Sequence, residues 1–208
     1  MKYSDAYQKT KNKIILQEYE PGYVFTAKDL SASEKIDEYD AADILYGLSA
    51  ELFLDHSSPF EFTVREISVD EINETFEVRK ALESLAAKLA ILHMDEKSEQ
   101  ELSDLLGDFA KITDEFTYAD VDDAIHRKIR EIAGNKSLKK QLLAIEEKEH
   151  CWWYYLNKNG RIKNPVSLAL NDHSMERLVK SVVNRDMINS SIAINEHLDY
   201  WYRVYNNA

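Results

Sequence analysis

The sequence predicts a mainly α-helical protein in which a small N-terminal domain precedes a larger antiparallel helical bundle. Only 5 Gly and 3 Pro occur among the 208 residues, which leaves few turns for a many-stranded sheet. Apolar residues recur at steps of three and four along most of the chain, as they do in helices that pack against other helices. The alternating segment FEFTVREI, at 60–67, predicts a strand.

Composition narrows the class of protein. The chain has a formal charge of -12 at pH 7, with 44% hydrophobic and 31% charged residues, as expected of a globular protein with a sizeable core. Cys151 is the only cysteine, which excludes an intramolecular disulfide and a cysteine-based zinc cluster. No apolar run approaches the roughly 20 residues that span a bilayer, and the start lacks the apolar segment of a signal peptide. We therefore expect a cytoplasmic protein without a membrane segment.

The first 67 residues follow the plan of a winged helix-turn-helix. Pro21-Gly22 predicts a turn between the first and second helices. Three short helical patterns precede the alternating segment, at about 5–18, 26–33 and 37–51. Three short helices followed by a small hairpin make a winged helix, so we expect this domain at 1–67 and a boundary near residue 68.

The remaining residues, 68–208, predict an all-helical domain. Ser68 and Glu71 form a capping box, in which each side chain can bond the other's backbone N–H. Gly134-Asn135 and Asn184-Arg185-Asp186 interrupt the apolar periodicity. The first predicted helix of this domain has a packing stripe of Ile72, Phe76, Leu82, Leu85, Leu89 and Leu92. Further stripes run over Leu102 to Ile112, Val121 to Ile132, and Leu138 to Ile145 with the aromatic run that follows. Two more helices are predicted at about 167–184 and 187–205, with a loop at 157–165.

Asp122 and His126 are the most specific candidate metal ligands. They lie four residues apart on one predicted helix, so both side chains can reach one ion, although a surface pair or a polar contact has the same spacing. His197 shares an apolar stripe of the last helix and should point inward, either as a ligand or as a hydrogen-bonded core histidine. His173 stands near the start of the preceding helix, as a helix-start residue or a ligand.

Motifs of enzymes are absent from the sequence. There is no Gly-rich phosphate loop, no Gly-x-Ser-x-Gly elbow and no Cys/His nucleophile arrangement. The aromatic runs 152–155 and 200–202 could line a ligand pocket, but aromatic residues at helical spacing more often form core. We therefore expect a protein that is not an enzyme.

Three segments of the predicted bundle carry a family resemblance. They are FEVRKALESLAAKLA (76–90), DDAIHRKIREIAGN (122–135) and the terminal EHL (196–198). Together they resemble the FCD-type effector-binding domain of the FadR branch of GntR-type bacterial transcription regulators. Upstream, ILQEYEPGYVF (15–25) is similar to that family's segment between the first helix and the turn, so the resemblance covers nearly the whole chain. It implies a homodimeric regulator that binds DNA and a small carboxylate effector.

The resemblance also implies a divalent metal, zinc-like or nickel-like, in the bundle core. Family members hold it through an Asp, a His four residues later and two further His, and Asp122, His126 and His197 match three of these places. The fourth place falls on Met175, a poor ligand for a borderline metal. Three alternatives follow: His173 substitutes through a shifted helix start, water or effector completes a three-ligand site, or no metal is bound.

Arg79 is the candidate effector-binding residue. The bundle cavity of the family accepts small carboxylates, and Arg79 lies in the VRKALE stretch that carries the resemblance. The alternative for this residue is an ordinary ion pair.

The predicted recognition helix departs from the family pattern. Members typically have Ser-Arg-x-Pro-x-Arg-Glu-Ala-Leu, whereas this chain has DEYDAADIL at 37–45, with Glu38 and Ala42 in place of the two Arg. Residues 37–50 hold four acids and no Lys or Arg, and residues 1–70 hold 7 basic and 14 acidic residues. Because DNA binding requires a positive face against phosphate, we expect DNA binding to be weak or absent, with no DNA-contacting residue assigned.

Two hypotheses about function follow. In the first, the chain is a ligand-responsive transcription regulator whose effector, with or without metal, alters how a dimer presents two winged helices to DNA. In the second, it is a divergent relative that does not bind DNA and acts as a small-molecule sensor or as a partner of another protein. A metal-dependent enzyme is disfavoured because no general base or nucleophile accompanies Asp122 and His126. The sequence names neither effector nor operator.

Overall fold

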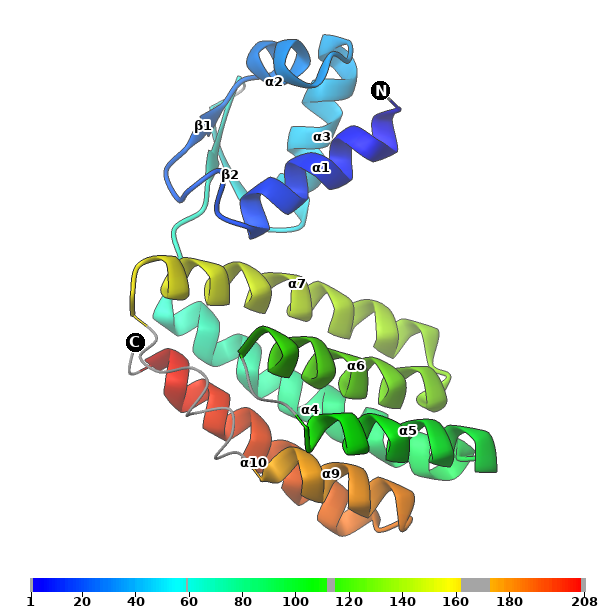
Figure 1. Cartoon of the computed structure of the whole chain (residues 1–208). Helices are drawn as coiled ribbons and strands as arrows, with labels where there is room; N and C mark the ends of the chain where they lie inside the picture. Colours follow the sequence, from blue (N-terminus) through cyan, green and yellow to red (C-terminus); the bar gives the residue numbers. More distant parts are fainter. Residues whose placement is uncertain (1, 59, 112–114, 162–172, 207–208) are drawn as a thin grey trace. The chain divides into compact units, whose positions relative to one another are not determined.

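The computed structural model describes residues 2–58, 60–111, 115–161 and 173–206. They divide into two compact units, one of residues 1–68 with 146–160 and one of 69–145 with 161–208 (Figure 1). The predicted class, a mainly α-helical chain with a winged helix followed by a helical bundle, is confirmed. No helix within these ranges is long and apolar enough to cross a membrane.

The first unit is a winged helix. Its helices are α1 (Tyr3–Ile15), α2 (Ala27–Glu34) and α3 (Glu38–Ala50), and its strands are β1 (Val24–Phe25), β2 (Leu54–Ser58) and β3 (Glu61–Val64). The three strands form one antiparallel sheet in the order β1-β3-β2. Phe25 lies opposite Phe62, and Leu54 lies opposite Val64, so the apolar side chains of neighbouring strands point to the same core.

Side-chain caps fix the starts of α2 and α3. The Thr26 hydroxyl accepts a hydrogen bond from the Asp29 N–H at 3.1 Å, and the Asp37 carboxylate accepts one from the Asp40 N–H at 2.8 Å. Lys35 ends α2 in the left-handed conformation, with φ 55°. The acids at the start of α3 therefore support the helix, because they also complement the positive end of its dipole.

The C-terminal part of α7 (Lys136–Lys158) completes this unit. The buried core draws on α1, α2, α3 and all three strands, and Cys151 and Tyr154 of α7 pack against it. Lys158 Nζ donates to the Gln17 carbonyl at 2.9 Å, and the Gln17 amide contacts Cys151 Sγ at 3.1 Å. A segment remote in sequence thus finishes the winged-helix core.

Ion pairs with one buried partner join the helices of the unit. The Glu34 carboxylate, on α2, is buried and pairs with Lys9 Nζ at 2.6 Å and Lys13 Nζ at 2.9 Å, both from α1. Burial tends to raise the pKa of Glu34, but the two ammonium groups outweigh it and lower the pKa. Lys11, also buried, pairs with Glu51 at 2.7 Å and Glu147 at 2.5 Å.

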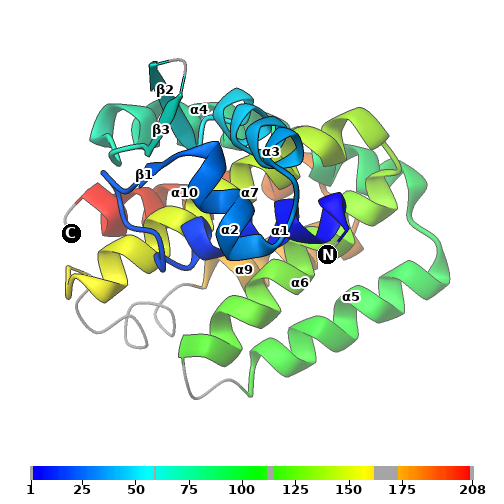
Figure 2. The same ribbon diagram turned by 90° about the horizontal axis from the view of Figure 1, so that it is seen from above.

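The second unit is a helical bundle. It contains α4 (Val69–His93), α5 (Glu96–Phe109), α6 (Glu115–Ala133), the first part of α7, α9 (Ser174–Val183) and α10 (Met187–Asn206). Helix α4 packs against α6 and α10, α5 lies beside α6, and α9 lies beside α10 (Figure 1, Figure 2). The helices predicted between Ile72 and Ile145 and the last predicted helix match these elements. The predicted end of the second helix at Ile112, the start of the helix predicted at 167–184 and the end of the loop predicted at 157–165 lie outside the described residues. The loop prediction begins too early, because α7 continues to Lys158.

The predicted packing stripe of α4 is partly wrong. Ile72 and Phe76 are buried as predicted, but Leu85 and Leu92 are 43% and 65% exposed. The buried face contains Arg79 and Glu83 in their place, together with Ala86, Ala87 and Ala90. A charged pair thus occupies part of the interior face of the helix, where spacing alone predicts apolar residues.

Replacing Glu34 by Gln should destabilise the winged-helix unit by about 1–2 kcal/mol at neutral pH, because two charge-assisted bonds are lost. The pKa of Glu34 is lowered in the folded protein, so its contribution is complete above the ordinary glutamate pKa and is lost as the pH falls through the lowered value. The free energies of unfolding of the wild type and the variant, measured in urea, should therefore converge in acid. The variant Glu18→Gln, at an exposed position, is the control. A difference that persists unchanged in acid would contradict this role.

Candidate metal and effector site

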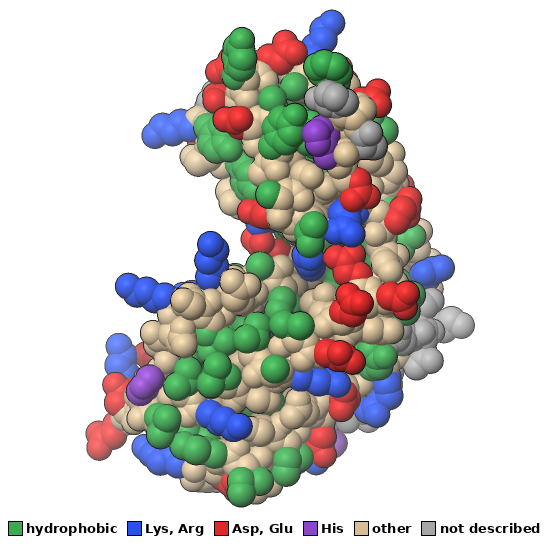
Figure 3. Space-filling view, turned by 180° about the vertical axis from the view of Figure 1, so that it is seen from behind, with side chains coloured by type: hydrophobic (Ala, Val, Ile, Leu, Met, Phe, Trp, Pro, Cys, Tyr) green, Lys and Arg blue, Asp and Glu red, His purple; other side chains and the backbone are tan. Residues whose placement is uncertain are grey.

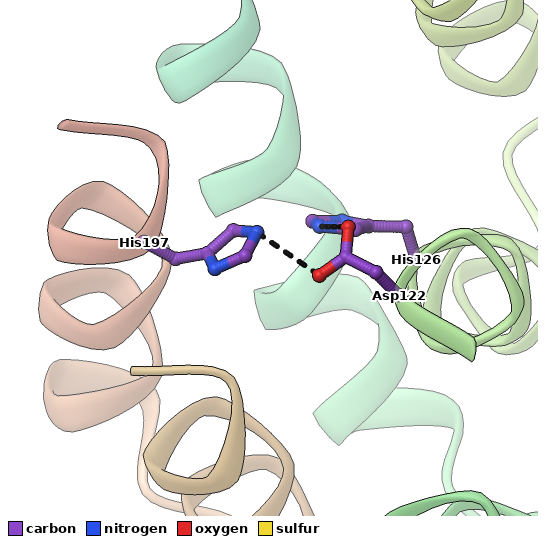
Figure 4. A group of neighbouring side chains, drawn as sticks. All are labelled: Asp122, His126 and His197. Atoms are coloured by element: carbon purple, nitrogen blue, oxygen red, sulfur yellow. Dashed lines mark ion pairs between the residues drawn. The ribbon is translucent and has the colours of Figure 1, made fainter. Parts of the chain in front are cut away.

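Three candidate ligands meet inside the helical unit. Asp122 and His126 project from α6 and His197 from α10, and their side chains turn toward one another (Figure 4). One ligand atom of each lies within 4.8 Å of the others. Asp122 Oδ1 is 3.4 Å from His197 Nε2, and Asp122 Oδ2 is 3.8 Å from His126 Nε2. The structure thus brings together the three residues that the sequence singled out.

Local sequence explains why these polar groups face inward. Asp122 and His126 are separated by one helical turn, and the apolar Ile125 and Ile129 beside them are fully buried, so α6 turns this face to the core. His197 lies between Ile194 and Leu198, both buried, and is itself 1% exposed. The prediction that His197 points inward is confirmed.

Several polar atoms of the cluster lack hydrogen-bond partners among the described residues. Within the described residues, neither ring nitrogen of His126 nor Asp122 Oδ1 has a hydrogen-bond partner of acceptable geometry. Buried polar atoms without partners are costly and rare. Two imidazole nitrogens and a carboxylate are also ordinary ligands of a divalent transition metal. The residues present therefore fit a cation that would satisfy them.

Glu83, on α4, is a member of the site that the sequence analysis missed. Its Oε1 lies 3.3 Å from His126 Nδ1, on the other side of the ring from Asp122. Burial tends to raise the pKa of Glu83, but His126, Arg79 and Arg130 outweigh it and lower the pKa to about 2. An ionised carboxylate at Nδ1 leaves Nε2 to face the centre of the cluster, which is how carboxylates orient metal-binding histidines.

The ionised state of Asp122 has a similar cause. Burial tends to raise its pKa, but His197, His126 and Arg79 together outweigh this effect and lower it. The carboxylate is therefore charged and available as a ligand. A neutral carboxylic acid in its place would have its own proton to donate and would bind a cation poorly.

Comparison with known families identifies the helical unit. A sequence model of the FCD domain matches residues 74–200, which is more than half of the chain. The chain belongs to the FCD domain family. No match is found among curated proteins.

Solved structures extend the likeness of this FCD protein to the whole chain. E. coli McbR/YncC is similar with a TM-score of 0.78 and 17% identity, over 98% of this chain and 96% of that one. A GntR transcriptional regulator from Rhodococcus sp. RHA1 is similar with a TM-score of 0.72 and 12% identity, over 99% and 98%. A GntR family member from Pseudomonas syringae gives 0.53 and 16%, over 97% and 83%. At these identities the likeness concerns the fold, and the predicted family resemblance is confirmed.

The fourth ligand place of this FCD domain remains without a metal-binding side chain of the usual kind. Met175 is fully buried on α9, so the place expected for a histidine is inside the unit but holds a thioether. His173 is the N-cap residue of α9 and is exposed, and it is not part of the cluster. The substitution of a ligand by His173 through a shifted helix start therefore finds no support in the structure.

Arg79 lies close to the cluster but already has a partner. It is 9% exposed, and its Nε is 3.8 Å from Glu83 Oε1, one helical turn along α4. Arg130 of α6 approaches the same oxygen at 3.7 Å. The ion-pair alternative for Arg79 is thus present in the structure, while its role toward an effector stays a prediction.

Replacing His126 by Ala should abolish divalent metal binding, because the two remaining ligands, Asp122 and His197, would be too few to hold an ion in competition with water. Calorimetric titration of the metal-free protein with Zn²⁺ or Ni²⁺ should give about one ion per chain for the wild type and near zero for the variant. His173→Ala is the matched control and should leave the stoichiometry unchanged. Equal stoichiometry in His126→Ala and the wild type would remove the site assignment.

Proposed function

We propose that this FCD protein is a ligand-responsive transcription regulator of the GntR family. The observation that carries the proposal is the buried Asp122–His126–His197 cluster in an FCD domain that the same chain joins to a winged helix. The similar solved structures of GntR regulators support it at the level of fold. In this proposal the helical unit binds a small molecule, and the winged-helix unit contacts the target of regulation.

A divalent metal in this site would be held by Asp122, His126 and His197. When bound, it would offer open coordination positions to an oxygen ligand. The Glu83 carboxylate lies 3.3 Å from Nδ1 of His126, on the side of the ring away from Asp122, and so would leave Nε2 to face the ion. Met175, buried on α9, carries a thioether that would compete poorly for a hard or borderline ion, so water or effector would complete the coordination.

Charge balance supports a carboxylate effector. The interior holds two carboxylates, Asp122 and Glu83, and two guanidinium groups, Arg79 and Arg130, whose charges cancel. A divalent cation would add two positive charges to a buried region, where unbalanced charge is expensive. A small carboxylate would offset part of this added charge, and Arg79 is our candidate for the side chain that binds its second oxygen.

An exposed apolar stripe on α4 supports a homodimer. Val78, Leu85 and Leu92 recur every seven residues and are 53%, 43% and 65% exposed. This spacing keeps them on one face of the helix, opposite the face that holds Glu83. Figure 3 shows hydrophobic side chains exposed together on a face of the helical unit. Such a face is the kind that a second copy covers in a twofold dimer.

Replacing Leu85 by Glu should weaken the dimer at least about tenfold, because each copy loses roughly 1.5–3 kcal/mol of apolar burial and gains a like charge near the twofold axis. Sedimentation velocity over a range of concentrations would measure the shift to monomer. Ile188→Glu, at an exposed position of α10, is the control and should stay dimeric. A wild type that is monomeric throughout, or dissociation by Ile188→Glu alone, would argue against the α4 stripe.

The alternative within this proposal is a relative that does not bind DNA directly. Glu38 and Asp43 are exposed on α3, the helix that a winged helix inserts into the major groove. Partial desolvation and the charges of Asp37 and Asp43 raise the pKa of Asp40, which reports a negative potential along the helix. Negative potential on this helix opposes phosphate, so we expect direct DNA binding to be weak and the protein to act chiefly as a sensor or partner.

Replacing Glu38 and Ala42 by Arg should raise the affinity for random double-stranded DNA. The dependence of log K on log salt should steepen by about 0.9 for each new phosphate contact. Fluorescence anisotropy at low and moderate salt would measure both quantities, with Ser4→Arg and Glu18→Arg as a control of equal charge away from α3. If the control gains as much as the α3 variant, or the wild type already selects particular genomic fragments at moderate salt, repulsion at α3 is not what limits DNA binding.

A further inference from the structure

The winged-helix unit contains a groove on its α3 face. The groove has a volume of about 640 Å³ and lies among the start of α2, the first turns of α3 and strand β3. Four aromatic residues line it: Tyr39 and Tyr46 from α3, and Phe60 and Phe62 from the wing. The groove therefore occupies the face through which a winged helix ordinarily meets DNA.

The aromatic lining is exposed to an unusual degree. Tyr39 is 88% exposed, Phe60 79% and Tyr46 48%. Aromatic rings that stay in water do not stabilise the fold by burial. Exposed aromatic groups that gather around a groove therefore indicate a binding surface. Figure 3 shows green hydrophobic side chains between red acidic ones on this unit, which is the mixture that the lining residues imply.

The base of the groove is held in place by ring contacts. Phe62 is buried and stacks on His56, with ring centroids 4.6 Å apart and an interplanar angle of 11°. Tyr46 packs edge-on against Phe62 at 5.0 Å and against His56 at 5.1 Å. These contacts fix Tyr46 and Phe62, while Tyr39 and Phe60 stand free of them at the rim. A ligand thus meets a preformed floor and two exposed rings.

The charge around the groove is negative on its α3 side. Glu38 lines the groove and is exposed, and Asp43 is exposed one turn beyond Tyr39. Residues 37–50 contain no Lys or Arg. Lys28, at the start of α2, is the single basic side chain among the lining residues that the structure describes, and Asp29 follows it directly. Aromatic faces beside a carboxylate attract an organic cation through both the ring quadrupole and the charge.

We propose that this groove binds a basic, partly apolar segment of a partner protein. An Arg or Lys side chain of the segment would lie over Tyr39 or Phe60 and pair with Glu38, and an apolar neighbour would contact Ala42 and Phe62. Nucleic acid fits the surface less well, because its phosphates would meet the acids of α3. The proposal goes beyond the sensing function and does not depend on metal or effector in the helical unit.

The test uses the full-length protein and short labelled peptides. One peptide alternates Leu with Arg, a second has Gln in place of Arg, and a third has Glu. Fluorescence anisotropy should show saturable binding of the Arg peptide, at least tenfold weaker binding of the Gln peptide and none of the Glu peptide. Tyr39→Ala combined with Phe60→Ala should reduce the affinity for the Arg peptide at least fivefold, and Glu38→Gln should reduce it and flatten its salt dependence.

Controls separate the groove from general attraction to an acidic protein. Tyr3→Ala and Glu18→Gln remove a partly exposed ring and an exposed acid elsewhere in the same unit, and both should bind the Arg peptide as the wild type does. Because all the substituted side chains are exposed, circular dichroism should show an unchanged fold. Equal loss in the control variants, no saturable binding of the Arg peptide, or competition by random DNA that the groove variants abolish would each overturn the proposal.

Discussion

The interior of the helical unit depends on one buried ionic contact, in which the Glu83 carboxylate meets the guanidinium groups of Arg79 and Arg130 and lies beside the His126 ring. A carboxylate in this position could not remain charged without neighbours of opposite charge, and its low pKa shows that they more than offset the cost of burial. The contact joins α4 to α6, because Glu83 and Arg79 come from one helix and His126 and Arg130 from the other. It also sets the direction of the His126 ring and hence the geometry of the whole candidate site.

In the winged-helix unit, acidic residues have structural roles of their own. Several of its acids stabilise the fold, as helix caps and ion-pair partners, and α3 has no Lys or Arg to balance the acids on its surface. Asp37 starts α3 and Glu34 ties α2 to α1, so their presence has a structural reason that is independent of DNA. What remains on the exposed face is a surface of rings and carboxylates. The same fold can therefore carry a surface chemistry opposite to the one that phosphate requires.

Sequence patterns predicted the helices and the wing, and helical spacing placed Asp122 and His126 on one face, while the family resemblance implied His197 as the third candidate ligand. They could not predict Glu83 in the site, since its neighbours come from a helix that lies about forty residues further on. Because helical periodicity contains no information on tertiary contacts, it also predicted Leu85 and Leu92 in the core, where Arg79 and Glu83 are found. His173 was a plausible ligand by proximity in sequence, and only the observed start of α9 shows it to be exposed.

The contribution of residues 146–160 to the first unit has a consequence for how the chain folds. Gln17 and Cys151, which touch in its core, are separated by 134 positions along the sequence. A nascent chain that emerges from the ribosome can form α1 to α3 and the wing early, but it cannot close this core until most of the protein has been made. Contacts of such high sequence separation slow folding and lengthen the time for which apolar surface is open to other chains. An isolated fragment that ends at residue 68 would keep that surface permanently uncovered.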